Sequence, residues 1–378
     1  MEFETIQLLP MASSHRGTLS PGCEQCQEGK KLVLFVTGLC RFRCFYCPVS
    51  ERRNQLDGVY ANERPVRTDA DVLEEARAIG AAGTGITGGD PLGVIDRTVH
   101  YVELLKKEFG PDHHIHLYTH EPNPQKLERL ARAGLDEFRL HIPHYLWGSL
   151  DGHGSAYRDV LTSAPTWGIR RGVEIPVLPE KEKELRRLLR SLDRLHLDFI
   201  NLNEMEFSAT NESALHARGY RVDAWNGWGV KGSRATAERM VREMHLRTPL
   251  HYCSSRFKDS MQLRRRLLRR AERTAPSFAD RTEDGTILLG IVEAAEVGQL
   301  PRIVKAMTSV GRVPSGDYRV NPGRRRVELA PDRLRGFARR LRFPAFAVEL
   351  YPTDDALEVE RTPLNTAAFP LSRGGGGR

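Results

Sequence analysis

Short apolar runs alternate with longer segments of helical periodicity through much of the chain. The first run, residues 31–38, is rich in β-branched and aromatic side chains and is short for a helix, which predicts a buried strand. Similar runs follow in turn at residues 84–87, 115–119, 137–141, 172–177 and 199–203. Because a helical segment follows nearly every run, the pattern indicates an α/β fold with a parallel sheet, and six such steps predict a partial (β/α)6 barrel.

The helical segments between these strands are marked by apolar periodicity and by capping residues. Thr68 or Asp69 is placed to cap the first segment, and Gly110 and Gly134 follow the ends of the second and third. The segments lie at residues 69–82, 96–109, 124–133, about 145–163 and 180–195, and a further helix is expected at 235–245, before a short run at 249–252.

The pattern changes after a basic helical stretch at residues 263–273. The order that follows is strand, helix, hairpin, helix and strand, which predicts a small α+β domain of the ferredoxin-like type. Its elements are expected at residues 286–292, 300–309, 317–329, 331–341 and 345–351.

These patterns divide the chain into four segments. An irregular leader that carries a cysteine pair is expected at residues 1–30, the barrel at 31–260, a basic helical connector at 261–280 and the small domain at 281–370.

Composition places the chain among soluble globular proteins. It has 378 residues, of which 40% are hydrophobic and 28% are charged. No apolar run is long enough to cross a membrane, and the first ten residues lack the pattern of a secretory signal, so a cytoplasmic location is expected. The net charge of +8 permits RNA or another anionic partner, but arginine-rich helix faces of this kind are often only solvated.

Five of the six cysteines lie in two tight groups near the N-terminus, which favours metal ligation over disulfides. Cys40, Cys44 and Cys47 follow the first predicted strand with the spacing C-x3-C-x2-C. Three thiolates can hold three irons of a [4Fe–4S] cubane and leave the fourth iron open to another ligand. A structural zinc site is the alternative for the same three residues.

The segment Gly-Leu-Cys-x3-Cys-Phe-Tyr-Cys resembles the cluster motif of the radical S-adenosylmethionine (SAM) superfamily. The resemblance covers residues 32–203, and the chain is similar to archaeal proteins related to pyruvate formate-lyase activating enzyme. It implies that SAM binds the open iron and that an external one-electron donor of the flavodoxin or ferredoxin type reduces the cluster. Reductive cleavage of SAM would then give a 5′-deoxyadenosyl radical that abstracts hydrogen from an unidentified substrate, either RNA or protein.

The resemblance also implies contacts between SAM and residues at the ends of the predicted strands. Tyr46 matches the aromatic position near the adenine, and the sequence Gly88-Gly89-Asp90 resembles the motif that meets the amino group of SAM. Glu174 and Asn203 lie in the fifth and sixth predicted strands, where polar groups are typical of ligand contacts.

A second metal site is predicted from the remaining cysteines. Cys23 and Cys26 form a C-x2-C pair, and Cys253 and His251 are the candidates for further ligands. A Cys3His set suits zinc, three cysteines alone suit a second [4Fe–4S] cluster, and inert buried thiols are the third possibility.

The competing function is that of a zinc-stabilised RNA-binding protein without catalysis. The positive net charge and the arginines at residues 264–270 favour it, while the open cysteine motif after a strand favours the enzyme.

Overall fold

The computed structural model describes residues 5–150, 152–153 and 155–366. The chain forms two compact units, residues Met1–Arg266 and Leu267–Arg378. Helix α10 (Arg264–Thr274) runs across the boundary between them. The predicted bounds of the barrel, the connector and the small domain, 31–260, 261–280 and 281–370, stay predictions.

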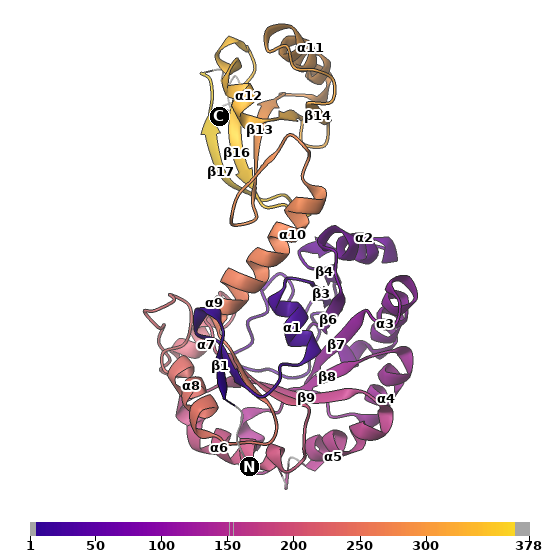
Figure 1. The fold of residues 1–378 in the computed structure, drawn as a ribbon, viewed down its shortest axis with the longest axis vertical. Helices are drawn as coiled ribbons and strands as arrows, with labels where there is room; N and C mark the ends of the chain where they lie inside the picture. Colours follow the sequence, from indigo (N-terminus) through magenta and orange to yellow (C-terminus); the bar gives the residue numbers. More distant parts are fainter. Residues whose placement is uncertain (1–4, 151, 154, 367–378) are drawn as a thin grey trace, which may run out of the picture. The chain divides into compact units, whose positions relative to one another are not determined.

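Unit 1 is built on a curved sheet with helices on its outer face (Figure 1). Neighbouring strands in its central part are parallel and follow one another in chain order, which confirms the predicted partial barrel. These strands are β3 (Lys31–Phe35), β6 (Gly83–Thr87), β7 (His114–Thr119), β8 (Glu137–Leu140), β9 (Arg170–Val177), β10 (Phe199–Glu204) and β11 (Leu250–Cys253). Strand β11 extends the predicted series by one.

Short antiparallel strands flank the parallel series on both edges. At one edge lie β4 (Tyr60–Ala61) and β5 (Arg64–Pro65), and at the other lie β1 (Ile6–Leu8) and β2 (Ser14–Arg16). Within the described residues, the two edges do not pair with each other, so the barrel is open.

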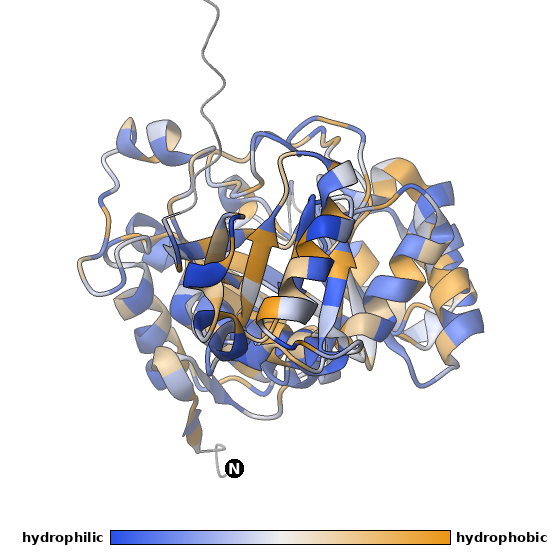
Figure 2. Cartoon of the chain, turned by 90° about the horizontal axis from the view of Figure 1, so that it is seen from above, coloured by the Kyte–Doolittle hydropathy of each residue, from blue (hydrophilic) through white to orange (hydrophobic). Residues whose placement is uncertain are grey.

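The outer helices bury one apolar face each against the sheet. In α6 (Glu182–Asp193) the buried positions are Leu185, Leu188, Leu189 and Leu192, which share one face at helical spacing. Figure 2 likewise shows helices of the chain that carry both hydrophilic and hydrophobic residues. The other helices of this unit are α2 (Asp69–Ile79), α3 (Ile95–Phe109), α4 (Pro124–Ala133), α5 (Ser155–Ser163), α7 (Glu212–His216), α8 (Ser233–Glu243) and α9 (Ser255–Phe257).

Several single turns connect these elements. A six-residue π-helix, η6 (Lys258–Leu263), joins α9 to α10. The 3-10 turns of unit 1 are η1 (Pro10–Ala12), η2 (Pro91–Val94), η3 (His144–Leu146), η4 (Ala164–Trp167) and η5 (Pro179–Lys181). Across the described ranges, we find no helix that is both long and apolar enough to span a membrane.

The segment expected to be an irregular leader is ordered and belongs to the barrel. Strand β2 pairs antiparallel with β11, and helix α1 (Pro21–Gln27) begins at Ser20, whose side chain accepts a hydrogen bond from the backbone of Cys23. The expectation was wrong because these elements span only three to seven residues, too few to show a period. In addition, the Pro21-Gly22 pair resembles a turn.

Helix α1 lies inside the ring of strands (Figure 1) and contacts β3, β6 and β7. Its Gly22 allows this close approach, because a Cβ there would lie 2.6 Å from both Arg139 and His116. The guanidinium of Arg139 then connects the helix to the barrel wall. It donates to Ser20 Oγ (3.1 Å) and to Cys23 Sγ (3.4 Å).

The same guanidinium pairs with two carboxylates of the barrel. Arg139 donates to Glu137 Oε1 (2.8 Å) on β8 and to Glu174 Oε2 (2.8 Å) on β9. Arg139 and Glu137 are buried and the Glu174 side chain is only 12% exposed, so each charge depends on its partners for stabilisation.

Unit 2 has the predicted ferredoxin-like order. Its strands are arranged β14-β15-β13-β16-β17, all antiparallel, and β12 pairs with β13. The four strands β13 to β16 and the two helices between them give the β-α-β-β-α-β order, to which β17 adds an edge. The elements are β12 (Asp280–Arg281), β13 (Ile287–Glu293), η7 (Val297–Gln299), α11 (Leu300–Val310), β14 (Tyr318–Asn321), β15 (Arg326–Leu329), α12 (Pro331–Arg335), η8 (Ala338–Arg340), β16 (Ala345–Leu350) and β17 (Glu358–Pro363).

Replacing Arg139 by methionine should destabilise unit 1 strongly. The substitution leaves Glu137 and Glu174 buried without their cation, and the loss of one partner from a buried pair costs about 3–5 kcal/mol. We expect this decrease in the free energy of unfolding, measured by denaturant-dependent hydrogen exchange on peptides from β8 and β9. The control Arg132→Met removes an exposed ion pair with Glu128 on α4 and should change the free energy of unfolding by less than about 0.5 kcal/mol. Equal effects of the two substitutions would contradict the central role of Arg139.

Candidate active site

A cavity of about 650 Å³ opens at the carboxyl ends of the parallel strands of unit 1. This is the edge of the sheet at which α/β barrels bind their ligands, and the volume is ordinary for a small-molecule site. Loops after β3, β6, β7, β8 and β11 contribute residues to it, as do the ends of β9 and β10. The lining includes Cys40, Cys44, Cys47, Tyr46, Gly88, Gly89, His120, His141, Glu174, Asn203 and Lys258.

The three cysteines of the predicted cluster motif lie together on an irregular loop after β3. The backbone N–H of Cys47 donates to the carbonyl of Cys44 (3.1 Å), which brings the two residues to one turn. Burial, with smaller contributions from the neighbouring Cys47 and Cys40, raises the pKa of the Cys44 thiol to about 11. Thiols that oppose one another's ionisation suit a metal centre, whose positive charge stabilises all three thiolates together. The residues present therefore fit a cluster with three cysteine ligands.

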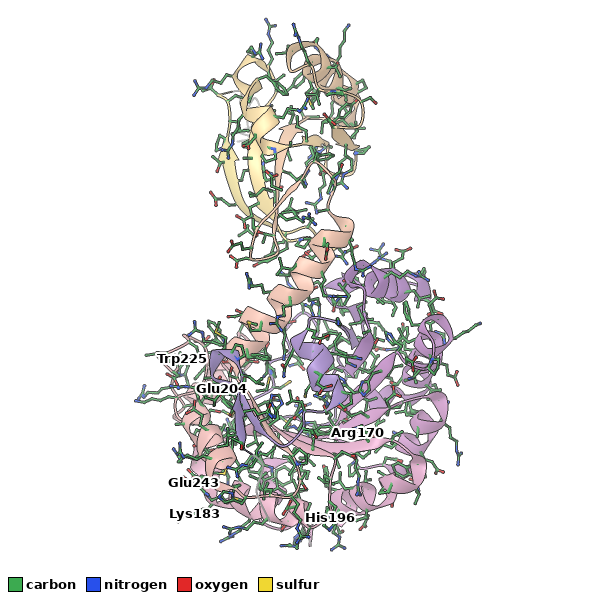
Figure 3. The ribbon with its side chains drawn as sticks, in the orientation of Figure 1. Arg170, Lys183, His196, Glu204, Trp225 and Glu243 are labelled. Atoms are coloured by element: carbon green, nitrogen blue, oxygen red, sulfur yellow. The ribbon has the colours of Figure 1, made fainter. Side chains whose placement is uncertain are left out.

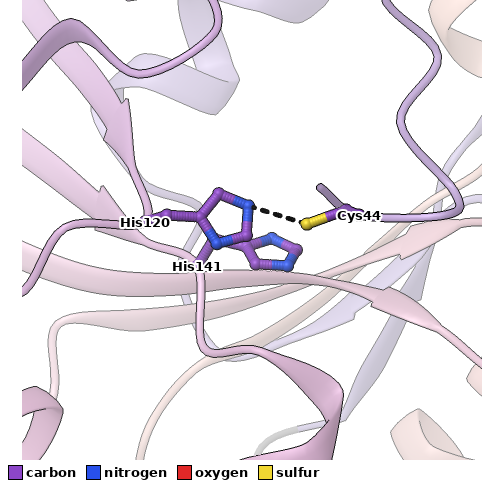
Figure 4. Close-up of side chains that lie close together, drawn as sticks. All are labelled: Cys44, His120 and His141. Carbon is purple, nitrogen blue, oxygen red and sulfur yellow. Dashed lines mark hydrogen bonds between the residues drawn. The ribbon is translucent and has the colours of Figure 1, made fainter. Parts of the chain in front are cut away.

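Two histidines stand next to this loop, as Figure 4 shows. The Nε2 atom of His120 lies 3.4 Å from Cys44 Sγ, and the rings of His120 and His141 are 3.9 Å apart. Within the described residues, Cys44, His120 and His141 are the group whose ligand atoms all lie within 4.8 Å of one another. Burial lowers the pKa of His120 to about 4, so its imidazole is neutral near pH 7 and can donate one hydrogen bond to a thiolate.

These histidines were not identified as site residues from the sequence. The signal was present, because His120 directly follows β7 and His141 directly follows β8, as the cysteines follow β3. Side chains at equivalent positions after adjacent parallel strands meet at one edge of the sheet.

Tyr46 is buried, and its hydroxyl is 2.9 Å from His141 Nε2. Burial raises the pKa of this phenol, so it stays protonated. The tyrosine therefore joins the cysteine loop to the end of β8 and forms part of the cavity wall.

Asp90 has a different position from its two neighbours. Gly88 and Gly89 line the cavity, whereas the Asp90 carboxylate is buried and accepts hydrogen bonds from Thr119 Oγ1 (2.7 Å) and the backbone N–H of His120 (3.0 Å). In the structure this side chain holds the loop that carries His120. The predicted contact between SAM and the Asp90 side chain stays a prediction.

Glu174 and Asn203 meet on the wall of the cavity. Asn203 Nδ2 donates to Glu174 Oε1 (2.7 Å), while Arg139 and Asn201 donate to Oε2 (2.8 and 2.9 Å). Burial acts to raise the pKa of Glu174, but these partners hold it below its usual value. The carboxylate is therefore ionised in the barrel interior and has a fixed orientation.

The residues of the predicted second metal site lie in the interior of unit 1. Cys23 is on α1, and its Sγ accepts hydrogen bonds from Asn201 Nδ2 (3.3 Å) and from Arg139. Cys253 ends β11 and is buried, and Cys26 is partly buried. His251 lies 3.3 Å from Asn201 Oδ1 through its Nδ1.

The remaining polar clusters have structural partners. Glu204, labelled in Figure 3, accepts hydrogen bonds from the backbone N–H and the hydroxyl of Ser255 at the start of α9. Figure 3 also shows Lys183, His196 and Glu243 at the outer edge of unit 1. Among the basic residues 264–270, Arg266 pairs with Glu63, which reduces the cationic surface available to RNA.

Comparison with known proteins places this site in a family. The model of the Radical SAM superfamily matches residues 34–145, which contain the cysteine loop, both glycines and both histidines. A domain of unknown function (DUF8061) matches residues 285–364. A protein of Methanocaldococcus jannaschii, named provisionally as a glycyl-radical enzyme activating enzyme, is 37% identical over 367 residues. The alignment covers 94% of this chain and 95% of that protein.

Solved structures give weaker likenesses. SuiB of Streptococcus suis bound to its precursor peptide SuiA aligns with 47% of this chain and 39% of its own length, with 13% identity and a TM-score of 0.37. A point mutant of spore photoproduct lyase aligns with 60% of this chain and 82% of its own length, with 13% identity and a TM-score of 0.37.

The near full-length relationship and the superfamily match agree with the cavity at the strand ends. The cofactors of the superfamily are a [4Fe–4S] cluster and SAM. This chain belongs to the radical SAM superfamily and is an enzyme related to the activating enzymes of glycyl-radical proteins.

Proposed function

We propose that Cys40, Cys44 and Cys47 bind the [4Fe–4S] cluster through three irons and leave the fourth for SAM. The observation that carries the proposal is that all three cysteines line one cavity at the carboxyl ends of the strands. With both the cluster and SAM bound, the transfer of one electron from the cluster to SAM would cleave SAM to methionine and a 5′-deoxyadenosyl radical, which would abstract hydrogen from the substrate. The residues around the cavity bind and orient SAM and the substrate, and they exclude water.

The polar wall of the cavity suits a zwitterionic and cationic ligand. The ionised Glu174, held by Arg139 and Asn203, offers a fixed negative group, and Lys258 on the same cavity offers a positive one. SAM carries an ammonium, a carboxylate and a sulfonium, so both signs of charge are needed. Tyr46 contributes an aromatic face beside the cysteine loop, where an adenine can pack.

The two histidines orient the cysteine loop. A neutral His120 donates a hydrogen bond to the sulfur of Cys44, and hydrogen bonds to ligand sulfurs stabilise the thiolate and tune the potential of a cluster. His141 holds the Tyr46 hydroxyl and packs against His120, so the loop keeps one position relative to the ends of β7 and β8.

An external one-electron donor of the flavodoxin or ferredoxin type is part of the proposal. A hollow beside the cysteine loop is lined by Phe45 and by the cations Lys181, Arg218, Arg221 and Lys231. The guanidinium of Arg218 lies over the Phe45 ring at 4.5 Å. Positive side chains next to the cluster loop suit an acidic donor protein, because charge complementarity steers association.

The substrate class that we favour is a glycine within a protein. The name of the Methanocaldococcus jannaschii relative supports it, and the alignment covers nearly all of both chains. The zinc-stabilised RNA-binding protein without catalysis is set aside, since the family consists of enzymes. RNA remains the alternative substrate, favoured by the positive net charge, the arginines at residues 264–270 and the appended small domain. A cytoplasmic location also remains a proposal.

The anaerobically reconstituted protein, reduced with dithionite and given SAM, should form 5′-deoxyadenosine. Cys40→Ala removes one cluster ligand and should lower the yield at least about a hundredfold, because SAM cleavage requires the open cubane. The product is quantified by liquid chromatography with mass spectrometry. Equal product from both proteins would contradict the assignment of the cysteines, and native protein that takes up only zinc would contradict the proposed function.

Substitution of Gly89 should disturb the cluster loop. The N–H of Gly89 donates to the carbonyl of Thr37 (2.6 Å), and a Cβ on Gly89 would lie 2.2 Å from the carbonyl oxygen of Leu39. Gly89→Ala therefore pushes against the backbone that leads into Cys40, and we expect at least about a tenfold loss of 5′-deoxyadenosine formation. Gly93→Ala is the matched control, because a Cβ there meets no atom within 4 Å. Its yield should stay within about twofold, and a similar loss in both variants would argue against the close-packing explanation.

The substrate class can be read from the hydrogen that reaches 5′-deoxyadenosine. Protein and RNA fractions of the source organism, each labelled with deuterium (the protein at glycine), are supplied separately to the reduced enzyme with SAM. We expect mass-shifted 5′-deoxyadenosine with the protein fraction only. Deuterium transfer from RNA alone would overturn the proposed substrate class, while SAM cleavage itself would stand.

A further inference from the structure

The barrel interior holds a second group of cysteines that the reaction proposed above does not use. Cys23 and Cys26 are three residues apart on α1 and therefore share one face of the helix. Cys253 comes from the opposite end of unit 1 in sequence, at the end of β11. Helix α1 and β11 are brought to the same interior by the β2–β11 pairing and by the position of α1 within the ring of strands (Figure 1).

Strand register shows that Cys253 points toward the same interior as the partners of Cys23. Asn201 pairs with His251 and Asn203 pairs with Cys253 in the parallel ladder of β10 and β11. Residues two apart on a strand share a face, so all four side chains lie on one side of the sheet. Asn201 reaches Cys23 Sγ from that side, at 3.3 Å. Helix α1, which carries Cys23 and Cys26, also contacts the π-helix η6, whose Gln262 lies next to Cys253 Sγ.

We propose that Cys23, Cys26 and Cys253 hold a second iron–sulfur cluster, of the [4Fe–4S] type, in the interior of unit 1. All six cysteines of the chain are then used, three on the loop after β3 and three here. Like the first cluster, the second has three cysteine ligands and one iron without a cysteine.

The surroundings supply the hydrogen bonds and the positive charge that an anionic cluster needs. Arg139 and Asn201 both donate to Cys23 Sγ, and Gln262 Nε2 lies 3.8 Å from Cys253 Sγ as a donor. The guanidinium of Arg139 therefore brings a positive charge next to Cys23. Hydrogen bonds and cations around ligand sulfurs are the means by which proteins stabilise thiolate-bound clusters.

Space for the group lies next to Cys26. A cavity of about 600 Å³ is lined by Cys26 and also by Lys258 and Gln262, the second of which contacts Cys253. Both of these residues belong to the π-helix η6, a form of backbone that is rare and frequently marks functional sites. The π-helix thus carries Gln262 to Cys253 and Lys258 to the wall of the cavity.

A buried nitrogen of His251 points to a group that the chain itself does not supply. His251 is 5% exposed, and the described residues offer its Nε2 no hydrogen-bond partner. An unpaired buried polar atom is costly and calls for an explanation. A cluster beside β11 would provide this partner, because its inorganic sulfides can accept a hydrogen bond from Nε2.

The spacing of the sulfurs favours a cluster over a single zinc ion. Tetrahedral zinc with bonds of about 2.3 Å to sulfur brings its ligand atoms within about 4 Å of one another. Within the described residues, only Cys44, His120 and His141 form a group of three whose ligand atoms all lie within 4.8 Å of one another. The second set, Cys23, Cys26, Cys253 and His251, contains no such group of three. A cubane binds each cysteine on a separate iron at a different corner and so suits the wider arrangement.

The test measures the metal content of two full-length variants, each of which lacks one group of three cysteines and is named after the group that it lacks. The loop variant carries Cys40→Ala, Cys44→Ala and Cys47→Ala, and the interior variant carries Cys23→Ala, Cys26→Ala and Cys253→Ala. Each protein is reconstituted anaerobically with iron and sulfide, and iron, sulfide and zinc are measured per chain. We expect about eight irons in the native protein and about four in each variant. A loop variant that binds no iron, or one zinc in place of iron, would overturn the proposal.

Two further substitutions in the loop variant keep the test decisive if the interior variant does not fold. Cys253→Ser should lower its iron content from about four to below about one, and Glu24→Ala, an exposed position between Cys23 and Cys26, should leave it unchanged. Iron that persists after Cys253→Ser would show that the ligand set is wrong. The proposed function is tested separately by the same measurements. About four irons in the native protein and none in the interior variant would contradict a cluster on the loop after β3, but would agree with the second cluster.

Discussion

The buried guanidinium of Arg139 is the interaction on which the interior of unit 1 depends. It lies between β8 and β9 and satisfies Glu137, Glu174, Ser20 and Cys23 at once. A lysine could not replace it, because an ammonium has three donors around one point, whereas the planar guanidinium presents five in a fixed fork. Through this one group, helix α1 is held inside the barrel and Glu174 is kept ionised on the cavity wall. The position of the N-terminal cysteine pair and the polarity of the cavity therefore have a common cause.

The carboxyl ends of the parallel strands impose the second constraint. Every loop that leaves this edge delivers its first residues to the same cavity, so groups from distant parts of the chain meet without long connections. The cysteine loop follows β3, Gly88 and Gly89 follow β6, and His120 follows β7. Their mutual positions are fixed by backbone contacts, such as that between Gly89 and Thr37, more than by side-chain packing. This explains why two adjacent glycines stand where side chains would otherwise be expected.

Sequence patterns predicted the parts of the fold whose elements are long or repeated. The strand–helix series of unit 1 and the ferredoxin-like order of unit 2 were confirmed, because each rests on several apolar periods. The role of α1 could not be predicted in this way. Seven residues show no period, and Gly22 serves the close approach to Arg139 and not a turn. For the candidate site, the spacing of Cys40, Cys44 and Cys47 identified the loop, whereas the position of His120 directly after β7 was a usable signal that the motif alone did not include.

Burial and metal binding act on the cysteines in opposite directions. Burial is the main cause that raises the pKa values of Cys44, Cys26 and Cys253, so each favours the neutral thiol in the protein interior. Iron reverses this preference because its positive charge stabilises the thiolate, and proton release then accompanies binding. The two cations of this interior differ in kind: Arg139 donates to five partners, which include the Tyr118 hydroxyl, whereas Lys258 is on a π-helix and lines both cavities. Lys258 shares this position with Glu206, its ion-pair partner at 3.9 Å, so the wall common to the two cavities carries both signs of charge.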